Sequence, residues 1–396
     1  MKAVIDLTKE YGLVLEGGGA KGAYQIGAWK AMQEAGVKIR GIAGTSVGAL
    51  NGALICMGDL EKAEHLWENI SYSKIMSVDD ELMGEIFKHK KISKEALKDM
   101  MDYISDGGLD VSPLKQLIAE SIDEEKIKNS PIDLYVLTFN VDEFRELDID
   151  MKEAEPELMK DFLLASAYVF PIFKNEKLHG KTYIDGGAIN NVPLGSLVER
   201  GYEDIIVIRI FGIGREKKVK IPEGTQVYTV APSVSLGSIL DFNRKKSRMH
   251  IKRGYFDTMR MIYGLSGKIY YIDEQAEECY YLKQLTELNQ DIYEYLMEVF
   301  KLNAEPKQYI RKLTEIILPV IADELQLSRD WNYRELYLSM LEAAARICRI
   351  QKYKIYTLEE LQNKVRKKLR DMEGELPAFV QIISKDILIQ PQQDEI

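Results

Sequence analysis

The sequence predicts an α/β protein with a mostly parallel central sheet, followed by a mainly helical carboxy-terminal region. In the first half of the chain, short apolar runs alternate with segments of helical periodicity, as in parallel strands joined by crossover helices. From about Ser238 onward, helical periodicity dominates. A length of 396 residues fits one large domain with a smaller partner. We therefore expect two parts, residues 1–265 and residues 266–396, with the boundary following Gly264 and Gly267.

Strand and helix signals alternate along the first part. The expected strands are Gly12–Leu15, Ile39–Ala43, Asp133–Val141, Thr182–Ile184, Asp204–Ile210 and Gln226–Ala231. The expected helices are Tyr24–Ala35, Val47–Met57, Leu60–Ser71, Lys94–Tyr103, Leu114–Ile122 and Met159–Ala167. In the second part, Thr357-Leu-Glu-Glu360 is a capping box that opens a charged helix through Arg370.

Charge and cysteine content exclude several classes of protein. The net charge of −10 argues against generic nucleic-acid binding, which depends on basic surface that neutralises phosphates. Cys56, Cys279 and Cys348 are widely spaced and form no C-x-x-C, so neither a disulfide framework nor a zinc knuckle is indicated. A reducing, cytoplasmic location is the simplest expectation.

No targeting or membrane-spanning segment is expected. Met1 to Lys9 carries both charge signs, which a signal peptide does not. Gly41 to Gly58 has no charged residue and approaches the length of a membrane span. It also holds five glycines, and a strand, a sharp turn and a buried central helix explain it better.

The stretch Leu13 to Gly27 contains a glycine loop that matches G-x-G-x-x-G. A dinucleotide-binding loop requires an acidic residue about 20 residues further on, at the end of the second strand. Here that strand, Ile39–Ala43, ends in Gly44-Thr-Ser-Val-Gly48 instead. A Walker A loop also fails, because Lys21 is followed by glycine.

G-x-S-x-G between a strand and a helix is the pattern of a nucleophile elbow. Small flanking residues allow the chain to turn so sharply that the serine oxygen, here that of Ser46, stands clear of the sheet. Both this turn and the glycine loop fall at the carboxyl edge of a parallel sheet, where ligands bind. The N–H groups of Gly17, Gly18 and Gly19 then suit an oxyanion hole, because residues without side chains approach an oxygen closely.

A serine nucleophile needs a base, and histidine is the usual one. Three of the four histidines lie in polar or charged stretches typical of solvent-facing residues: His65, His89 and His179. His250 is the serious competitor, because the order Ser46, Asp185, His250 reproduces that of an α/β-hydrolase triad. Against it, that fold places several strands before its elbow, and the positive charges around His250 would disfavour an imidazolium.

Asp185 is the other candidate base. A strand ends on it, and Gly186 and Gly187 leave its carboxylate unobstructed. A carboxylate within hydrogen-bond reach of the serine oxygen can act as general base. A plain structural Asp-Gly turn is the alternative interpretation.

These motifs together resemble the patatin-like phospholipase family of bacterial type. Its pattern is a glycine loop G-G-G-x-R/K-G, a G-x-S-x-G elbow and a distant D-G-G or D-G-A. The matching segments are Gly17-Gly-Gly-Ala-Lys-Gly22, Gly44-Thr-Ser-Val-Gly48 and Asp185-Gly-Gly187, with Ala165-Ser-Ala-Tyr-Val-Phe-Pro171 similar to the family's A-S-x-x-x-P block. The resemblance covers roughly residues 11 to 262.

The resemblance implies a three-layer α/β/α fold that hydrolyses fatty acyl esters of phospholipids or related lipids through a Ser-Asp dyad and an acyl-enzyme. Ser46 would be the nucleophile, Asp185 the base, and Gly17 to Gly19 the oxyanion donors. Supporting roles would fall to Gly44 and Gly48 in the elbow, Lys21 and Gly22 in the glycine loop, and Gly186 and Gly187 beside the aspartate. No metal or cofactor is required. Lys21 replaces the commoner arginine, and Val169-Phe170 stand where small or polar residues are frequent.

Two alternatives remain beside the hydrolase. One is a catalytically weak patatin-like protein that binds lipids or acts as a scaffold. The other, a nucleotide-dependent oxidoreductase, lacks its ribose-binding acid. The basic stretch Arg244 to Arg253 is the best local candidate for peripheral membrane contact, although a solvated helix face is the simpler interpretation. Head-group preference, oligomeric state and the role of residues 266–396 stay open.

Overall fold

The computed structural model of the chain describes residues 1–88, 108–174, 176–372, 374 and 376–386. The chain folds into two compact units. Lys2–Tyr263 is the amino-terminal unit, and Gly264–Ile396 with Met1 is the carboxy-terminal unit. The helix expected at Lys94–Tyr103 and the side chain of His89 lie outside the described residues. The roles assigned to residues 1–265 and 266–396 stay predictions.

A mixed sheet of seven strands forms the centre of the amino-terminal unit, as far as the chain is described. The strands are β1 (Glu10–Leu15), β2 (Lys38–Thr45), β3 (Asp133–Asn140), β4 (Arg145–Asp150), β5 (Tyr183–Asp185), β6 (Asp204–Ile208) and β7 (Gln226–Val230). Their order is β4-β3-β2-β1-β6-β7, and β5 pairs with β3. The neighbours from β3 to β7 are parallel, whereas β4 and β5 run antiparallel to β3. The expected mostly parallel sheet is confirmed.

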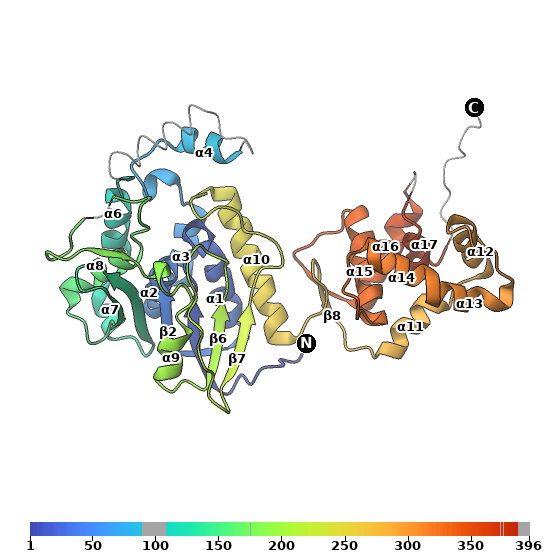
Figure 1. The fold of residues 1–396 in the computed structure, drawn as a ribbon, viewed down its shortest axis with the longest axis horizontal. Coiled ribbons are helices and arrows are strands. Elements are labelled where there is room, and N and C mark those ends of the chain that lie inside the picture. Colours follow the sequence, from blue (N-terminus) through green and yellow to red (C-terminus); the bar gives the residue numbers. More distant parts are fainter. Residues whose placement is uncertain (89–107, 175, 373, 375, 387–396) are drawn as a thin grey trace. The chain divides into compact units, whose positions relative to one another are not determined.

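Helices cover both faces of this sheet, as Figure 1 shows. They are α1 (Ala23–Ala35), α2 (Val47–Met57), α3 (Leu60–Glu68), α4 (Asp80–Lys88), α6 (Ser112–Ser121), α7 (Glu124–Lys128), α8 (Pro156–Ser166), α9 (Leu194–Glu199) and α10 (Arg244–Tyr263). Alternate residues of β1 face opposite sides. Leu13 and Leu15 belong to the large core with α1, α2 and α10, while Val14 belongs to a smaller core with Leu197 of α9. The predicted three-layer arrangement is therefore confirmed.

The helices next to the glycine loop and the elbow end at glycines. α1 ends at Gly36 with φ of 79°, and α2 ends at Gly58 with φ of 77°. This left-handed conformation at a helix end favours glycine and satisfies the last carbonyl groups. After its terminal glycine, α1 leads into β2, and α2 leads into α3.

Strand β4 is not among the strands predicted from the sequence. Its sequence, RELDID, is polar, and none of its residues is fully buried. Such charged strands are common at sheet edges, where they discourage pairing with another chain. Its two apolar residues, Leu147 and Ile149, alternate with acidic residues and pack partly buried against the core, but this short polar run gave too weak a strand signal.

The carboxy-terminal unit is mainly helical, as expected. Its helices are α11 (Glu278–Thr286), α12 (Gln290–Val299), α13 (Tyr309–Lys312), α14 (Leu318–Glu324), α15 (Tyr333–Ile347), α16 (Leu358–Arg370) and α17 (Phe379–Ser384). β8 (Tyr271–Asp273) and β9 (Ile355–Thr357) form a small parallel pair. The Thr357 side chain accepts the Glu360 N–H at 3.1 Å and caps α16, which confirms that expected helix start. The unit has a hydrophobic core of its own.

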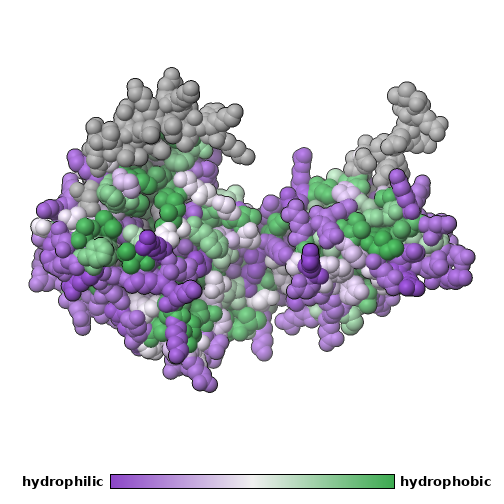
Figure 2. All heavy atoms as spheres, viewed as in Figure 1, coloured by the Kyte–Doolittle hydropathy of each residue, from purple (hydrophilic) through white to green (hydrophobic). Residues whose placement is uncertain are grey.

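Hydrophilic side chains cover most of the face seen in Figure 2, with hydrophobic patches between them. Among the described residues, we find no helix with the length and apolar character needed to cross a membrane.

Candidate active site

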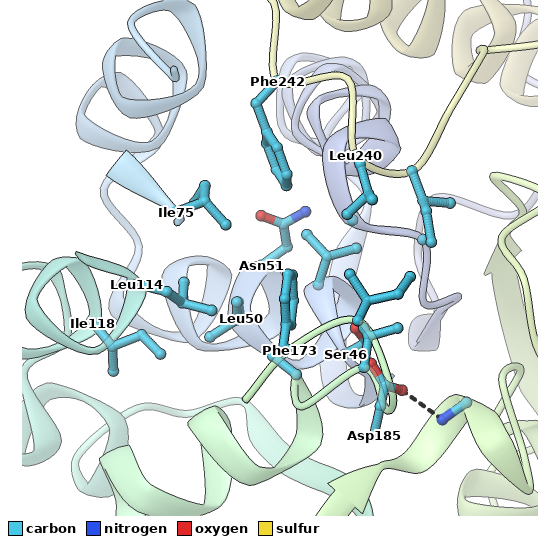
Figure 3. A pocket seen from close by; sticks show the side chains of 18 of the residues that line it. Ser46, Leu50, Asn51, Ile75, Leu114, Ile118, Phe173, Asp185, Leu240 and Phe242 are labelled. Atoms are coloured by element: carbon cyan, nitrogen blue, oxygen red, sulfur yellow. Dashed lines mark hydrogen bonds between the residues drawn. The ribbon is translucent and has the colours of Figure 1, made fainter. Parts of the chain in front are cut away.

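Strand β3 brings the two candidate catalytic residues together. β2 pairs with its first half, so that Thr45 lies opposite Leu137. β5 pairs with the next residues of β3, so that Asp185 lies opposite Thr138. Because β4 occupies the other edge of β3 over the same residues, β2 and β5 follow one another along one edge. Ser46, directly after β2, therefore lies beside Asp185, as Figure 3 shows.

Ser46 stands on a sharp, strained turn between β2 and α2. Its φ of 56° and ψ of −126° are unusual for a residue with a side chain. A Cβ at Gly44 would lie 2.5 Å from the carbonyl carbon of Gly48, and one at Gly48 would lie 2.2 Å from the Leu15 oxygen. The turn thus needs glycine on both sides, which is the geometry of a nucleophile elbow.

The elbow is also held from β3 through Ser166. The Ser166 hydroxyl donates to the Leu137 carbonyl at 2.6 Å and accepts the Ser46 N–H at 2.8 Å. Ser166 is fully buried. The serine of the block Ala165–Pro171 therefore supports the candidate nucleophile Ser46, a contact that the sequence pattern alone did not reveal.

The Asp185 carboxylate is buried against the elbow. Its Oδ1 accepts the Gly187 N–H at 2.6 Å, and the Ser46 side chain lies beside it. Burial raises the pKa of Asp185 to about 6, and the neighbouring Ser46 hydroxyl and the Gly187 N–H lower it only in part. A Cβ at Gly186 would lie 2.5 Å from the Leu137 oxygen, so this glycine lets the turn pass close to β3. The arrangement provides a serine hydroxyl with an adjacent proton acceptor.

The first residue of the glycine loop is held inside the fold. The Gly17 N–H donates to the Asn191 carbonyl at 3.1 Å, and the Gly17 carbonyl accepts the Asn191 Nδ2 at 3.1 Å. A Cβ at Gly17 would lie 3.2 Å from the Ser46 Cβ. Because its N–H is already bonded, the expectation of three glycine donors is corrected to two.

Gly18 and Gly19 line the same cavity as Ser46. Gly19 has a φ of 53°, and the next residue is anchored, because the Ala20 N–H donates to the Ile239 carbonyl at 2.7 Å. The N–H groups of Gly18 and Gly19 are therefore the donors that we expect at a developing oxyanion.

Lys21 and Gly22 support the loop from behind. Lys21 is buried, and its Nζ donates to the Phe211 carbonyl at 2.5 Å. Burial lowers the pKa of Lys21. A Cβ at Gly22 would lie 2.4 Å from Val47 Cγ2, so glycine allows the loop to pack on α2. Lys21 thus contacts the backbone and does not line the cavity.

His250 does not join Ser46 and Asp185. Its ring is buried near the backbone of Ala20. Burial, followed by the positive charge of Arg253, lowers the pKa of His250 to about 4. His250 thus lies beside the glycine loop and does not line the cavity at Ser46.

The other two described histidines also lie away from the elbow. His179 is exposed and pairs with Asp161 at 2.7 Å, and His65 is a neighbour of Asn69 on α3. Neither lines the cavity. In the described part of the chain, no histidine replaces Asp185 as the neighbour of Ser46.

A cavity of about 450 Å³ opens at Ser46 and Asp185. Its wall is mostly aliphatic and aromatic and comes from α2, α3, α6 and the segments 167–173 and 239–242. Figure 3 shows Leu50, Leu114, Ile118, Phe173 and Phe242 around it. Among the described lining residues, Asp185 alone carries an ionisable side chain. The described residues contain no group of three or more His, Cys, Asp or Glu placed to hold a metal ion.

Comparisons with known proteins find similarity in the amino-terminal unit. Residues 13–198 match the family model described as patatin-like phospholipase, and they form a patatin-like phospholipase domain. The chain is similar to lysophospholipase nte1 of Aspergillus terreus, with 59% identity over 46 residues, which is 12% of this chain. It is also similar to neuropathy target esterase sws of Drosophila persimilis, with 62% identity over 45 residues, or 11% of this chain. The match spans only 3% of the length of each of these relatives.

A solved structure of VipD from Legionella pneumophila is also similar. The match covers 95% of this chain and 84% of that chain, with 14% sequence identity and a TM-score of 0.39.

Proposed function

We propose that the amino-terminal unit is a serine acyl hydrolase that cleaves fatty acyl esters of phospholipids or related lipids. One observation carries the proposal: Ser46, on a strained elbow, lies beside the buried carboxylate of Asp185 at the wall of an apolar cavity. A nucleophile, a base and an apolar site for the acyl chain then lie together.

In the proposed reaction, the Ser46 hydroxyl attacks the acyl carbonyl while Asp185 accepts its proton. The N–H groups of Gly18 and Gly19 stabilise the oxyanion of the tetrahedral intermediate. Asp185 returns the proton to the departing alcohol, which leaves an acyl-enzyme. It then takes a proton from water, and the resulting hydroxide attacks the acyl-enzyme. Asp185 gives this proton to the Ser46 oxygen as the acyl–oxygen bond breaks, which releases the fatty acid and restores the free enzyme.

The size of the cavity favours one fatty acyl chain. At about 30 Å³ for a water-sized group, a volume of 450 Å³ holds about 15 groups of roughly methylene size. Each buried methylene contributes about 0.8 kcal/mol of transfer free energy. Binding is therefore expected to depend mainly on the acyl chain.

The rim of the cavity supports peripheral contact with a lipid surface. Phe170 and Ile213 line the cavity, yet their exposed fractions are 68% and 77%. Arg244, Lys245 and Arg248 are exposed at the start of α10, directly after the lining segment 239–242. Exposed apolar side chains at the cavity, with cations on the segment that follows part of its wall, suit the surface of an anionic lipid layer. An acyl chain could then pass from the layer into the cavity along an apolar path.

The test is hydrolysis of a panel containing a diacyl phospholipid, a lysophospholipid and a monoacylglycerol. Wild-type protein is expected to release fatty acid, and Ser46→Ala and Asp185→Asn to lose at least about 10³-fold in rate. His250→Ala is the comparison variant for the dyad and should retain turnover. A wild-type protein that binds fatty acid but hydrolyses no member of the panel would favour the lipid-binding alternative.

A further inference from the structure

A buried carboxylate lies directly before the glycine loop. The exposed fraction of Glu16 is 2%, and its side chain receives five hydrogen bonds. Oε2 accepts the N–H groups of Ile210 at 2.6 Å and Phe211 at 2.9 Å, and Arg209 Nε at 3.1 Å. Oε1 accepts the Gly212 N–H at 3.2 Å and, less closely, Asn191 Nδ2 at 3.4 Å.

Burial of a charge is costly unless donors replace its water. Three of the donors to Glu16 are consecutive backbone N–H groups in the segment after β6. The carboxylate therefore fixes the path of an irregular loop that belongs to no strand or helix. We call residues 209–215 the β6 loop.

The β6 loop packs directly on the glycine loop. A Cβ at Gly212 would lie 1.8 Å from the Gly17 oxygen and 2.9 Å from the Gly18 Cα. A Cβ at Gly18 would lie 2.7 Å from Ile210 Cδ1 of the same loop. No side chain separates the two backbones at Gly212, so a shift of the β6 loop would move Gly17 and Gly18.

The far end of the β6 loop is joined to the turn that carries Asp185. The Arg215 N–H donates to the Gly187 carbonyl at 2.9 Å, and the Arg215 carbonyl accepts the Asn191 N–H at 2.6 Å. Asn191 in turn accepts the Gly17 N–H. The β6 loop thus connects the expected oxyanion donors with the expected base.

We propose that Glu16 is a positioning residue of the active site: through the β6 loop, it sets the place of the Gly18 and Gly19 N–H groups relative to Ser46. The proposal rests on the proposed hydrolase function. Glu16 does not line the cavity, so it acts through these groups and touches no substrate.

The consequence is an effect on the chemical step. Oxyanion donors act at distances of about 3 Å, and a displacement of about 1 Å costs on the order of 100-fold in rate. In Glu16→Gln, the amide NH₂ would face backbone N–H groups on one side of the former carboxylate. We expect kcat to fall about 100-fold, with KM for a soluble nitrophenyl ester changed less than about threefold.

The experiment compares Glu16→Gln with Glu342→Gln in the full chain. Glu342 is a matched control in the carboxy-terminal unit: it is 3% exposed and accepts the N–H groups of Ile269 at 2.8 Å and Tyr270 at 2.7 Å. For each variant, the thermal midpoint, ester hydrolysis, fluorophosphonate labelling rate and displacement of a fluorescent fatty acid are measured. Both variants should lose thermal stability, but only Glu16→Gln should lose kcat and labelling rate while its fatty acid affinity stays unchanged.

A folded Glu16→Gln variant with a kcat within twofold of wild type would overturn the inference. If kcat falls equally in Glu16→Gln and Glu342→Gln, the loss is a general effect of lower stability, and this result would also overturn the inference. If Glu16→Gln does not fold, Arg209→Met decides, because the carboxylate keeps its backbone donors and loses its charged partner. We then expect kcat to fall about tenfold, and an unchanged kcat contradicts the proposal. A wild-type protein inert toward ester and probe would instead refute the proposed function.

Discussion

Acidification is expected to switch off hydrolysis with a midpoint near pH 6. The proposed base, Asp185, must be ionised to accept the Ser46 proton, and burial raises its pKa to about 6. A pH series from about 8 to about 4.5, with wild-type protein and a soluble nitrophenyl ester, titrates this group. A soluble substrate separates the chemical step from binding to a lipid surface.

The size of the effect follows from the fraction of ionised Asp185. One unit below the pKa, about a tenth of a carboxyl group is ionised, and two units below, about a hundredth. With a pKa of about 6, kcat/KM at pH 5 should be about a tenth of its plateau. An aspartate with the ordinary pKa of 3.8 would leave the rate near its plateau at pH 5. The same holds for His250 as base, because its pKa is about 4.

The contribution of Asp185 to the stability of the fold has the opposite pH dependence to its contribution to the rate. The pKa of Asp185 is about 6 in the folded chain against the ordinary 3.8, so folding takes up a proton between these values. Its contribution to the free energy of unfolding is fully present below 3.8, is lost as the pH rises through 6, and amounts to about 3 kcal/mol. Loss of activity at pH 5 would therefore not come from destabilisation by this group.

The assay records kcat/KM at constant ionic strength, with circular dichroism at each pH as the control for folding. His250→Ala should keep the midpoint near pH 6, since this ring does not contact the dyad. A midpoint near pH 4, or a rate that stays flat to pH 5 in folded protein, would refute the assignment of Asp185 as a buried base.

Two further predictions concern the support of the elbow and the rim of the cavity. Ser166→Ala leaves the buried Ser46 N–H without its acceptor, so we expect the free energy of unfolding to fall by about 1–3 kcal/mol and kcat to be lower. Urea titration measures the change in stability. An unchanged free energy of unfolding would contradict the hydrogen bond between Ser46 and Ser166. Replacing both Phe170 and Ile213 by serine should weaken partitioning onto anionic vesicles at least about tenfold, measured by sedimentation, whereas Phe144→Ser, exposed but outside the cavity, should not. Equal losses in the two proteins would speak against a specific rim.

The sequence predicts those parts of the site that are formed by local backbone geometry. Gly44 and Gly48 predict the sharp turn at Ser46, because no larger residue fits at either position. The capping box at Thr357 is likewise local, and its helix begins where expected. In both cases, a short local pattern of residue types is enough to predict the turn or the helix start.

The remaining parts of the site depend on pairing between distant segments. Nothing near Asp185 in the sequence says that β5 continues the edge of β3 where β2 ends. For the same reason, the bond from Ser46 to Ser166 and the engagement of the Gly17 N–H by Asn191 could not be predicted. A glycine pattern gives the number of available N–H groups, but only the fold decides which of them are already bonded.

Glu16 illustrates the same limit. In the sequence, it is a single charged residue between an apolar strand and three glycines. Its five donors come from segments about 175 to 196 residues away in the chain. No local pattern distinguishes such a buried carboxylate from a solvent-exposed one at a strand end.

The proposed mechanism depends above all on Ser46 as the nucleophile, and peptide mass spectrometry of fluorophosphonate-treated protein identifies the reacting residue. We expect a single phosphonylated residue, Ser46, with no adduct in Ser46→Ala. The pH dependence of labelling should follow that of hydrolysis, with a midpoint near 6. An adduct on another serine, or labelling of Ser46→Ala at the wild-type rate, would show that Ser46 is not the nucleophile.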